Sequence, residues 1–478
     1  MKRSLVLGFL AIGWVAGCAM APPDPYIFPE RPARVQYEED PAAYIDVDAP
    51  LVALVGAKVF DGLGSPALLN QTLLLHEGYI EVVGAADEVP VPDSAFVIDM
   101  AGRTVIPGIV GMHNHMHMPG IHFIGYSGPR LYLASGVTTI QTTGSASPDA
   151  EAELARDIEA GLAAGPDIVH TGPYFSGEGG SPAMINPEGE AHVRELMQHW
   201  TEKEVTWLKA YRHIAPADLQ LLINIAHEYG AKVTGHLCTV TYKEAAAMGI
   251  DAIEHGFIHS YDHAEGKEAG KCSGSRDFRS NLPLDSEAIR EVHQTLIEHG
   301  VALTSTLAIF EAQVPSRAYA DDRTFAAMSP RWLENYEVRR RRMDATGANW
   351  YFKEDWLVRS MAYDLAFFRA GGLLTAGLDP GLHNLPGFGD QRNFELFIEA
   401  GFSVAEAIQV MTSNGAAVLE YPDIGRIQPG FRANLVVIDG NLEADASHIR
   451  DVAWVFKDGY GFSPGRLLAD VQGVVGDR

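Results

Sequence analysis

Cysteine is scarce in this sequence, with only 3 among 478 residues. So few cysteines cannot build the dense disulfide framework that holds small secreted domains together. Cys18 lies near the amino terminus, which leaves Cys238 and Cys272 for the body of the chain. In an oxidising compartment these two can pair; two unpaired, buried thiols are the alternative.

Basic residues are also few, with 36 Lys and Arg against 62 Asp and Glu and a formal net charge of -26. A surface of this charge repels polyphosphates, and no basic stripe along the chain reverses the balance. The composition therefore excludes nucleic acid as an expected partner and predicts a solvated acidic surface.

Long apolar runs are missing after the first 17 residues. Lys2 and Arg3 precede an apolar run over residues 5–17, which is too short to span a bilayer as a stable helix. The run ends in VAGC at residues 15–18, which resembles a bacterial lipobox. This resemblance implies a signal peptide over residues 1–17 and lipidation of Cys18. An ordinary secretory signal with an incidental cysteine is the alternative.

From the resemblance to a lipobox, we expect the protein in a bacterial cell envelope, bound to the membrane through its lipid. Ala19 follows the cysteine, where an aspartate would resemble an inner-membrane retention signal, so the outer membrane facing the periplasm is favoured. Residues 18–50 are predicted to be a tether, because from Ala21 onward they are rich in Pro, Asp and Glu.

The middle of the chain alternates short apolar runs with amphipathic stretches, a pattern typical of parallel βαβ units. With 478 residues, 47% of them hydrophobic, a large core is available. Eight such units predict an α/β fold, a (β/α)8 barrel of the TIM type over residues 107–419, with a charged insertion over residues 313–352. The eight apolar runs cover residues 109–115, 137–143, 167–172, 205–211, 232–238, 251–255, 302–307 and 373–379.

Both ends of the mature chain show strands and tight turns instead. Apolar stretches at residues 51–55 and 433–438 are each bounded by turn residues such as Asp61-Gly62 and Pro429-Gly430. We therefore expect residues 51–106 and 420–478 to form one small β-sandwich domain, split in sequence by the barrel.

Residues able to bind a metal recur at the ends of five of the predicted strands, where TIM barrels carry their active sites. Alternate residues of a strand face the same side, so His113 and His115 can reach one ion. Imidazole suits zinc and similar divalent cations. His117 is in phase with them and is the competing ligand. The full set is His113, His115, Lys209, His236, His255 and Asp379.

The string PGIVGMHNH at residues 107–115 resembles the metal motif of the amidohydrolase superfamily, in its imidazolonepropionase-like and prolidase-like branch. The resemblance continues through GIDAIEHG at 249–256, TSNGAA at 412–417 and IQPGFRANLVV at 427–437. This chain departs from the pattern at Gly111, where an aspartate is frequent, and at Leu237, Cys238 and Leu378. No departure removes a ligand, but together they leave the substrate open.

The resemblance implies two divalent metal ions, with His113, His115 and Asp379 at the first. His236 and His255 match the ligands of the second. Lys209 is implied to take up carbon dioxide, because a free ammonium buried beside two cations is unfavourable, and its carbamate would bridge the metals. A lysine paired with a carboxylate, and an aspartate that caps a turn, are the alternatives for Lys209 and Asp379.

The expected chemistry is hydrolysis of an amide C–N bond in a dipeptide or an N-acyl amino acid by metal-bound hydroxide. Asp379 would accept the proton of the attacking water and pass it to the leaving amine. Tyr211 could donate to the developing oxyanion, with Arg212 and His259 as further substrate contacts. The alternatives are a cyclic-amide hydrolase, a deaminase and a non-catalytic binding lipoprotein. A homo-oligomer is possible, and its size stays open.

Overall fold

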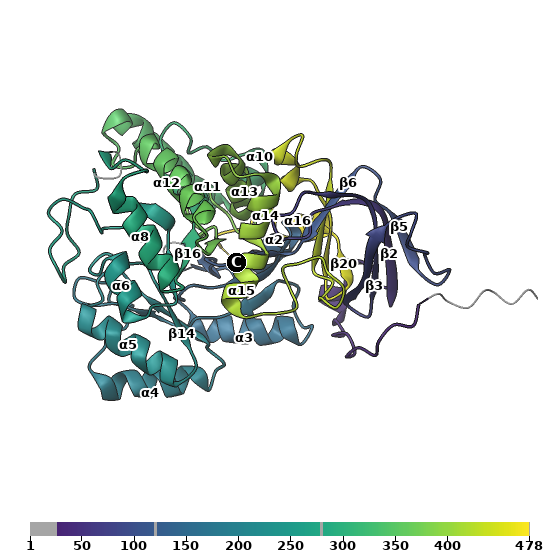
Figure 1. The fold of residues 1–478 in the computed structure, drawn as a ribbon, viewed down its shortest axis with the longest axis horizontal. Helices are drawn as coiled ribbons and strands as arrows, with labels where there is room; N and C mark the ends of the chain where they lie inside the picture. Colours follow the sequence, from purple (N-terminus) through teal and green to yellow (C-terminus); the bar gives the residue numbers. More distant parts are fainter. Residues whose placement is uncertain (1–25, 119–121, 278–280, 478) are drawn as a thin grey trace, which may run out of the picture.

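The computed structural model describes residues 26–118, 122–277 and 281–477. The predicted signal peptide over residues 1–17 and the lipidation site Cys18 lie outside the described residues. Figure 1 shows two parts side by side, a body of helices and parallel strands and a sheet built from early and late strands. In the described ranges, no helix combines the length and apolar character needed to cross a membrane.

Nine strands form the sheet, in the order β1-β20-β19-β18-β6-β2-β3-β4, with β5 paired to β2. The early strands are β1 (Ile45–Val47), β2 (Leu51–Val59), β3 (Leu68–His76), β4 (Tyr79–Ala85), β5 (Phe96–Asp99) and β6 (Arg103–Pro107). The late strands are β18 (Leu435–Asp439), β19 (Val452–Lys457) and β20 (Tyr460–Phe462). Strands β6 and β18 pair in antiparallel register over five residues, which joins the two ends of the chain.

The sheet buries apolar side chains on both faces. Along β2, Val52 and Leu54 enter one apolar cluster and Ala53 enters another on the opposite face. One hydrogen-bonded path joins all nine strands, and Val52 and Leu54 share their cluster with Val437 of the late strands. The expected sandwich of two sheets stays a prediction. On the face that carries Ala53, the sheet is covered by Tyr26 and Phe28 and by the segment around Val89.

The described part of the predicted tether, residues 26–50, packs against the sheet. Strand β1 pairs with β20, and Arg31 forms an ion pair of 2.7 Å with Glu81. The ring of Tyr37 makes an edge-to-face contact with Tyr460 at 5.3 Å. The prediction of a free tether is therefore wrong for these residues, because the aromatic side chains among the Pro, Asp and Glu residues find apolar partners.

The body contains two parallel sheets. One has the order β11-β10-β7 and the other runs from β12 to β17 in sequence order. Each of the eight apolar runs contains one of these strands. They are β7 (Ile109–Gly111), β10 (Val137–Gln141), β11 (Asp167–Val169), β13 (Trp207–Ala210), β14 (Lys232–Gly235), β15 (Ala252–Glu254), β16 (Ala302–Ser305) and β17 (Leu374–Ala376), with the short β12 (Tyr174–Phe175) following β11.

Backbone hydrogen bonds connect the two parallel sheets. Met112, just after β7, donates its N–H to the carbonyl of Ala376 in β17 at 2.8 Å. On the other side, Ser145 donates to Gly172 at 2.9 Å in the segment between β11 and β12. The carboxyl ends of the first and last strands of the body consequently lie next to each other.

Helices connect and cover the strands of the body, as Figure 1 shows. They are α2 (Ser127–Ala134), α3 (Pro148–Glu159), α4 (Glu190–Thr201), α5 (Pro216–Glu228), α6 (Tyr242–Met248), η1 (Gly256–His259), α8 (Glu287–Glu298), α9 (Leu307–Glu311), α12 (Glu354–Arg369), α13 (Phe388–Ala400), α14 (Val404–Met411) and α15 (Ser413–Leu419). The predicted insertion holds α10 (Asp322–Ala327), α11 (Pro330–Thr346) and η2 (Gly347–Asn349). In sequence α1 (Glu39–Ala42) precedes the body, and η3 (Ala446–Arg450) and α16 (Pro464–Asp470) follow it and pack on α13 and α2. Strands β8 (His117–Met118) and β9 (His122–Phe123) follow β7 and pair with each other.

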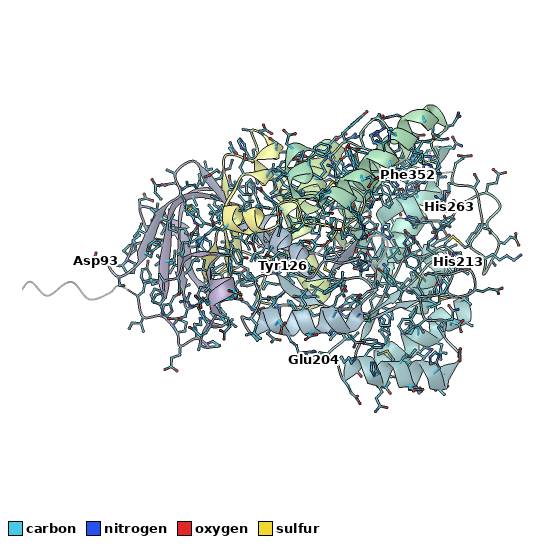
Figure 2. All side chains as sticks on the ribbon, turned by 180° about the vertical axis from the view of Figure 1, so that it is seen from behind. Asp93, Tyr126, Glu204, His213, His263 and Phe352 are labelled. Atoms are coloured by element: carbon cyan, nitrogen blue, oxygen red, sulfur yellow. A yellow bond between two sulfur atoms is a disulfide. The ribbon has the colours of Figure 1, made fainter. Side chains whose placement is uncertain are left out.

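Cys238 and Cys272 form a disulfide bond, which resolves the alternatives left by the sequence. Cys238 follows β14 closely, and Cys272 lies in the long segment between η1 and α8. The bond ties this segment to the carboxyl end of a body strand. Figure 2 shows His213 and His263 at one end of the molecule and Asp93, in the turn before β5, at the other end.

Candidate metal centre

The candidate ligands lie just beyond the carboxyl ends of the strands. Strand β7 ends at Gly111, so His113 and His115 both follow it, although we expected them within an extended strand. The segment after β7 is held beside the segment after β17, because Asp379 donates its N–H to the carbonyl of His113 at 2.8 Å. The ends of the first and last strands therefore hold their polar side chains against each other.

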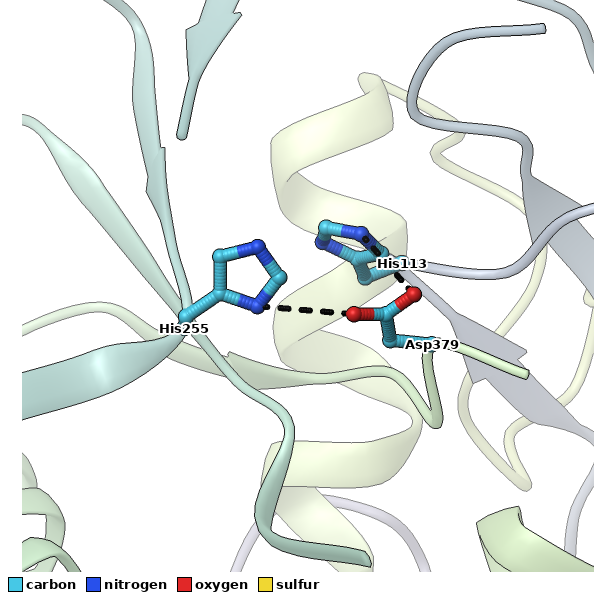
Figure 3. Close-up of side chains that lie close together, drawn as sticks. All are labelled: His113, His255 and Asp379. Atoms are coloured by element: carbon cyan, nitrogen blue, oxygen red, sulfur yellow. Dashed lines mark ion pairs between the residues drawn. The ribbon is translucent and has the colours of Figure 1, made fainter. Parts of the chain in front are cut away.

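His113, His255 and Asp379 form a group that could hold a metal ion, shown in Figure 3. One potential ligand atom from each lies within 4.8 Å of the others. Asp379 Oδ1 is 3.9 Å from His113 Nε2, and Oδ2 is 3.8 Å from His255 Nδ1. His115 Nε2 joins them at 3.5 Å from Asp379 Oδ1. One carboxylate thus faces three imidazoles from two other segments.

The outward nitrogens of the first two histidines already have acceptors. His113 Nδ1 donates to Glu254 Oε2 at 2.6 Å, and His115 Nδ1 donates to the carbonyl of Gly144 at 3.1 Å. These bonds leave Nε2 of each ring facing Asp379 with its lone pair available. Metal-binding histidines usually donate their other N–H to a carboxylate or carbonyl in this manner. The donor set therefore fits a divalent cation.

Lys209, at the end of β13, is buried with 1% of its surface exposed. Its Nζ has no hydrogen-bond partner among the described residues. Burial lowers the pKa of Lys209 to about 8, although Glu254 and Asp379 act in the opposite direction. Burial thus makes the neutral amine of Lys209 more accessible at neutral pH than that of a solvated lysine.

His236 and His259 extend the group into a row of rings. The ring centroid of His255 is 4.5 Å from that of His113 and 4.3 Å from that of His236. His259, in η1, lies 4.2 Å beyond His236. Nε2 of His236 is buried without a hydrogen-bond partner in the part of the chain that is described. The structure therefore brings all six predicted ligands to one end of the parallel strands.

Burial favours the neutral form of three imidazoles in this group. Burial lowers the pKa of His113, and it holds the pKa of His236 and His255 well below the usual value. A metal ligand must be unprotonated, so burial prepares these rings for a cation. For Asp379, burial acts to raise the pKa, but His113 and its neighbours hold the pKa below its usual range and keep the carboxylate ionised.

Asp379 is positioned by a set of side-chain amides. It has a positive φ of 50°, a left-handed conformation that a non-glycine residue adopts only when its surroundings hold it there. Asn114 accepts from the N–H of Leu378 at 3.1 Å, and Asn393 donates to the carbonyl of Gly377 at 2.7 Å. Asn384 donates to the carbonyl of Leu378 at 2.8 Å. The carboxylate is thus fixed by its backbone on both sides.

Two of the predicted substrate contacts have different surroundings. Tyr211 follows β13, with its ring 4.8 Å from that of His236, so it borders the centre. Burial raises the pKa of Tyr211, which keeps its phenol protonated and able to donate. Arg212 instead points to the disulfide, where Nη2 lies 3.8 Å from Cys272 Sγ and Nε is buried without a partner in the described chain.

His117, the competing ligand, has partners of its own. Its Nε2 lies 3.3 Å from the hydroxyl of Tyr174, and its Nδ1 lies 3.9 Å from Glu151 Oε1. Its ring is 4.7 Å from that of His115. Tyr174 and Glu151 were missed by the sequence reasoning. A glutamate in an otherwise amphipathic helix and a tyrosine in a short strand carry no local signal for this site.

Glu254 was also missed, although it lies within the quoted GIDAIEHG string. Besides holding His113, it accepts a hydrogen bond from Thr234 and is fully buried. Burial acts to raise its pKa, but Lys209 and His113 hold the pKa of Glu254 at about 2. The available signal was a glutamate inside an apolar strand directly before a candidate ligand.

Comparisons with known proteins agree with this geometry. The model of the amidohydrolase family matches residues 134–459, more than half of the chain. The imidazolonepropionase of Streptomyces avermitilis is 26% identical over 397 residues, covering 80% of this chain and 84% of that protein.

Solved structures show the same fold. Bottromycin amidohydrolase superposes with a TM-score of 0.68 at 16% identity, covering 89% of this chain and 91% of that one. A Xaa-Pro dipeptidase with bound methionine gives 0.62 at 17% identity, covering 86% and 100%. The solved relatives imply a TIM-type barrel with a separate domain. The chain belongs to the amidohydrolase family and is a hydrolase that acts on carbon–nitrogen bonds.

Proposed function

We propose that this protein hydrolyses the amide bond of a dipeptide or an N-acyl amino acid with the help of two divalent cations, zinc being the expected one. The observation that carries the proposal is the arrangement of four histidines, Asp379 and a buried Lys209 without a partner at one end of the parallel strands. We further propose that the eight strands of the body close into the predicted (β/α)8 barrel, with the centre at its mouth.

The residues are assigned to two ions. His113, His115 and Asp379 would hold the first, and His236 and His255 the second. When bound, such ions supply Lewis acidity, which polarises a carbonyl group and lowers the pKa of water. Glu254 and the carbonyl of Gly144 orient the two imidazoles of the first site by accepting their outward N–H groups.

Lys209 is proposed to be carboxylated. Its neutral amine would attack carbon dioxide, forming an N–C bond and releasing a proton, and the product is a carbamate anion. The change replaces a buried nitrogen that lacks a partner with an anion among groups that bind cations. The carbamate oxygens would then serve as ligands shared by the two sites.

Asp379 and Tyr211 are assigned to the proton transfer and to the carbonyl oxygen. The ionised carboxylate of Asp379 can accept the proton of the attacking water and release it to the leaving amine. The phenol of Tyr211, beside His236, can donate a hydrogen bond to the oxygen on which negative charge develops. His259, beside His236, is the remaining substrate contact.

The substrate class is supported by names that the relatives carry. A solved structure of the same fold is a Xaa-Pro dipeptidase, and curated relatives are imidazolonepropionases. The dipeptidase favours a linear amide as the substrate, whereas the imidazolonepropionases support the cyclic-amide alternative. Deamination is disfavoured because deaminases of this superfamily typically work with one metal and have no bridging lysine.

The proposal is tested by metal analysis followed by a substrate screen. Metal-replete protein should hold close to two divalent ions per chain, and one ion or none would contradict the two-metal centre. A panel of dipeptides, N-acyl amino acids and cyclic amides should give turnover in the first two groups. Turnover confined to cyclic amides would select the alternative, and no turnover in metal-loaded protein would favour a binding lipoprotein.

Anchoring is proposed from the lipobox-like string alone. Cys18→Ser should release the protein from the membrane fraction or leave it unprocessed. Unchanged fractionation, together with a mature amino terminus that carries no lipid mass, would contradict the anchor.

A further inference from the structure

A fully buried carboxylate lies in the first turn of α3, the helix that follows β10. It belongs to Glu151, and neither of its oxygens has a hydrogen-bond partner among the described residues. Its only ion-pair neighbour in these parts of the chain is the ring of His117, whose Nδ1 lies 3.9 Å from Oε1. Burying a carboxylate away from water is unfavourable, so its retention beside a single imidazole calls for an explanation.

His117 connects this carboxylate to a tyrosine. Its other ring nitrogen, Nε2, lies 3.3 Å from the hydroxyl of Tyr174 in β12. Burial holds the pKa of Tyr174 well above its usual value, so the hydroxyl keeps its proton and can donate. A neutral imidazole that accepts at Nε2 carries its hydrogen on Nδ1, the nitrogen that faces Glu151. The polarities of the three groups therefore match in one direction, from the phenol to the carboxylate.

Tyr174 lies beside the candidate metal centre. It is the register partner of Lys209 where β12 pairs with β13. Its ring makes an edge-to-face contact with the ring of Tyr211 at 5.4 Å. The ring of Tyr211 in turn lies 4.8 Å from that of His236. The position of the Tyr174 ring therefore limits where the phenol of Tyr211 can lie.

The backbone fixes one side of the Tyr174 ring. Gly144 faces this ring so closely that a Cβ at this position would come within 2.3 Å of it. The carbonyl of the same glycine accepts from His115 Nδ1 at 3.1 Å. Gly144 thus contacts the ring and also orients a candidate ligand, whereas the hydroxyl end of Tyr174 is held by His117.

We propose that Glu151 and His117 are positioning residues for Tyr211. The carboxylate receives the Nδ1 hydrogen of the imidazole, Nε2 accepts the hydroxyl hydrogen of Tyr174, and the edge of that phenol holds the ring of Tyr211. A buried carboxylate that fixes the tautomer and orientation of an imidazole has the same effect in serine-hydrolase triads. The inference rests on the proposed role of Tyr211, and it gives His117 this supporting role in place of the competing one at the metal.

The first test reads the ring of His117 by NMR of the zinc-loaded full chain with 15N-labelled histidine, assigned by comparison with His117→Gln. The wild type should carry hydrogen on Nδ1, with Nε2 as a hydrogen-bonded acceptor. Glu151→Leu keeps a similar volume and removes both acceptor oxygens, so the hydrogen should move to Nε2. Glu153→Gln, at an exposed position of the same helix, is the matched control and should leave the wild-type signals.

Labelled tyrosine extends this test to the end of the chain of contacts. The ring signals of Tyr211 should shift in Glu151→Leu and in Tyr174→Phe, and they should stay unchanged in Glu153→Gln. A wild-type imidazole with hydrogen on Nε2, or Tyr211 signals that neither variant shifts, would overturn the inference.

The second test is a double-mutant cycle with the dipeptide that the wild type hydrolyses fastest. Glu151→Leu and Tyr174→Phe should each lower kcat by about tenfold or more, because a displacement of about 1 Å can cost about 100-fold. The KM should stay within about twofold, and the metal content should be that of the wild type.

In a Tyr211→Phe background the same two changes should have no further effect, since the hydroxyl that they position has been removed. Equal losses in both backgrounds would overturn the inference, because the residues would then act on the fold rather than through Tyr211. A protein that gives both NMR results but hydrolyses no amide would uphold the positioning and refute the proposed function alone.

Discussion

The composite sheet and the histidine-lined strand ends use buried residues in opposite ways. In the sheet, Leu54 and Val437 are fully buried in an apolar cluster, and the backbone groups of β2 and β18 pair with those of neighbouring strands. At the strand ends, Lys209 is buried as deeply, yet its amine has no partner in the described chain. The first arrangement stabilises the fold by removing apolar surface from water.

The second arrangement works against stability. Buried polar atoms without hydrogen bonds each cost free energy of unfolding, so a native protein retains them only where something else requires them. Besides Lys209 Nζ, such atoms include His236 Nε2 and both carboxylate oxygens of Glu151. We infer that the sheet mainly supplies stability and that the strand ends supply the chemistry. Variants in one region should therefore change one property and leave the other as it is.

The largest effect is expected at Lys209. Lys209→Ala should lose more than about 100-fold in turnover, since even residues that only support a ligand account for 10–100-fold. It should also lose metal while the chain stays folded, because the change leaves the apolar pattern of β13 intact. Metal content and rate must be measured on the same sample.

A matched control and a rescue sharpen this prediction. Lys203→Ala removes a lysine that pairs with Asp149 at the surface, and it should leave metal and rate unchanged. Short carboxylic acids added to Lys209→Ala should restore part of the activity by occupying the vacated position. A variant that keeps its metals and a measurable rate would show that Lys209 has only a structural role.

Glu254→Gln should weaken metal binding by about 10–100-fold, because His113 loses the carboxylate that orients it. Competition with a chelator of known affinity measures the change. Glu228→Gln, which alters an exposed pair with Arg194, is the control and should show no change. An unaltered affinity in Glu254→Gln would mean that His113 does not depend on this hydrogen bond.

Leu54→Ala should act on the other region alone. Removing a fully buried leucine from β2 should lower the free energy of unfolding by about 2–5 kcal/mol. The metal content and the rate per folded molecule should be those of the wild type. Leu69→Ala, at a position 67% exposed on β3, should change stability by less than about 0.5 kcal/mol. A fall in the rate per folded molecule would show that the sheet also influences the chemistry at the strand ends.

Asp364 should show a smaller effect that depends on pH. Burial raises its pKa to about 7, although Ser305 donates to it at 2.5 Å. Because the folded pKa lies above the unfolded value of about 3.9, the folded state binds more protons between these values. The free energy of unfolding should therefore fall as pH rises from about 4 to about 7. Asp364→Asn should reduce this fall by up to about 4 kcal/mol, and an equal dependence of the unfolding free energy on pH in denaturant titrations would contradict it.

The repeating units of the fold could be predicted from the sequence because their signal is local. Each parallel strand is a short apolar run bounded by an amphipathic helix, and all eight runs contain a strand. The candidate ligands were recognised as polar residues at the ends of these runs, and their role as ligands stays a prediction. Strand lengths were less certain: β7 ends at Gly111, two residues before the first histidine.

Long-range pairing could not be predicted in the same way. Residues 26–50 have the composition of a tether, but Tyr37 meets Tyr460, more than four hundred residues later in the chain. The pairing of Cys238 with Cys272 depends on a geometry that spacing does not reveal. Glu151 and Tyr174 border the site through a helix and a short strand whose sequence patterns are ordinary.

The pairing of β6 with β18 has a consequence for the order of folding. Arg103 and Asp439 are hydrogen-bonded neighbours separated by 336 residues in sequence. During synthesis, β2 to β6 leave the ribosome long before their late partners exist, so the edge of β6 stays unpaired while the whole middle of the chain is made. Such non-local contacts slow folding, and an unpaired edge invites association with other chains. Shortening the chain before β18 should thus produce aggregates rather than a smaller enzyme.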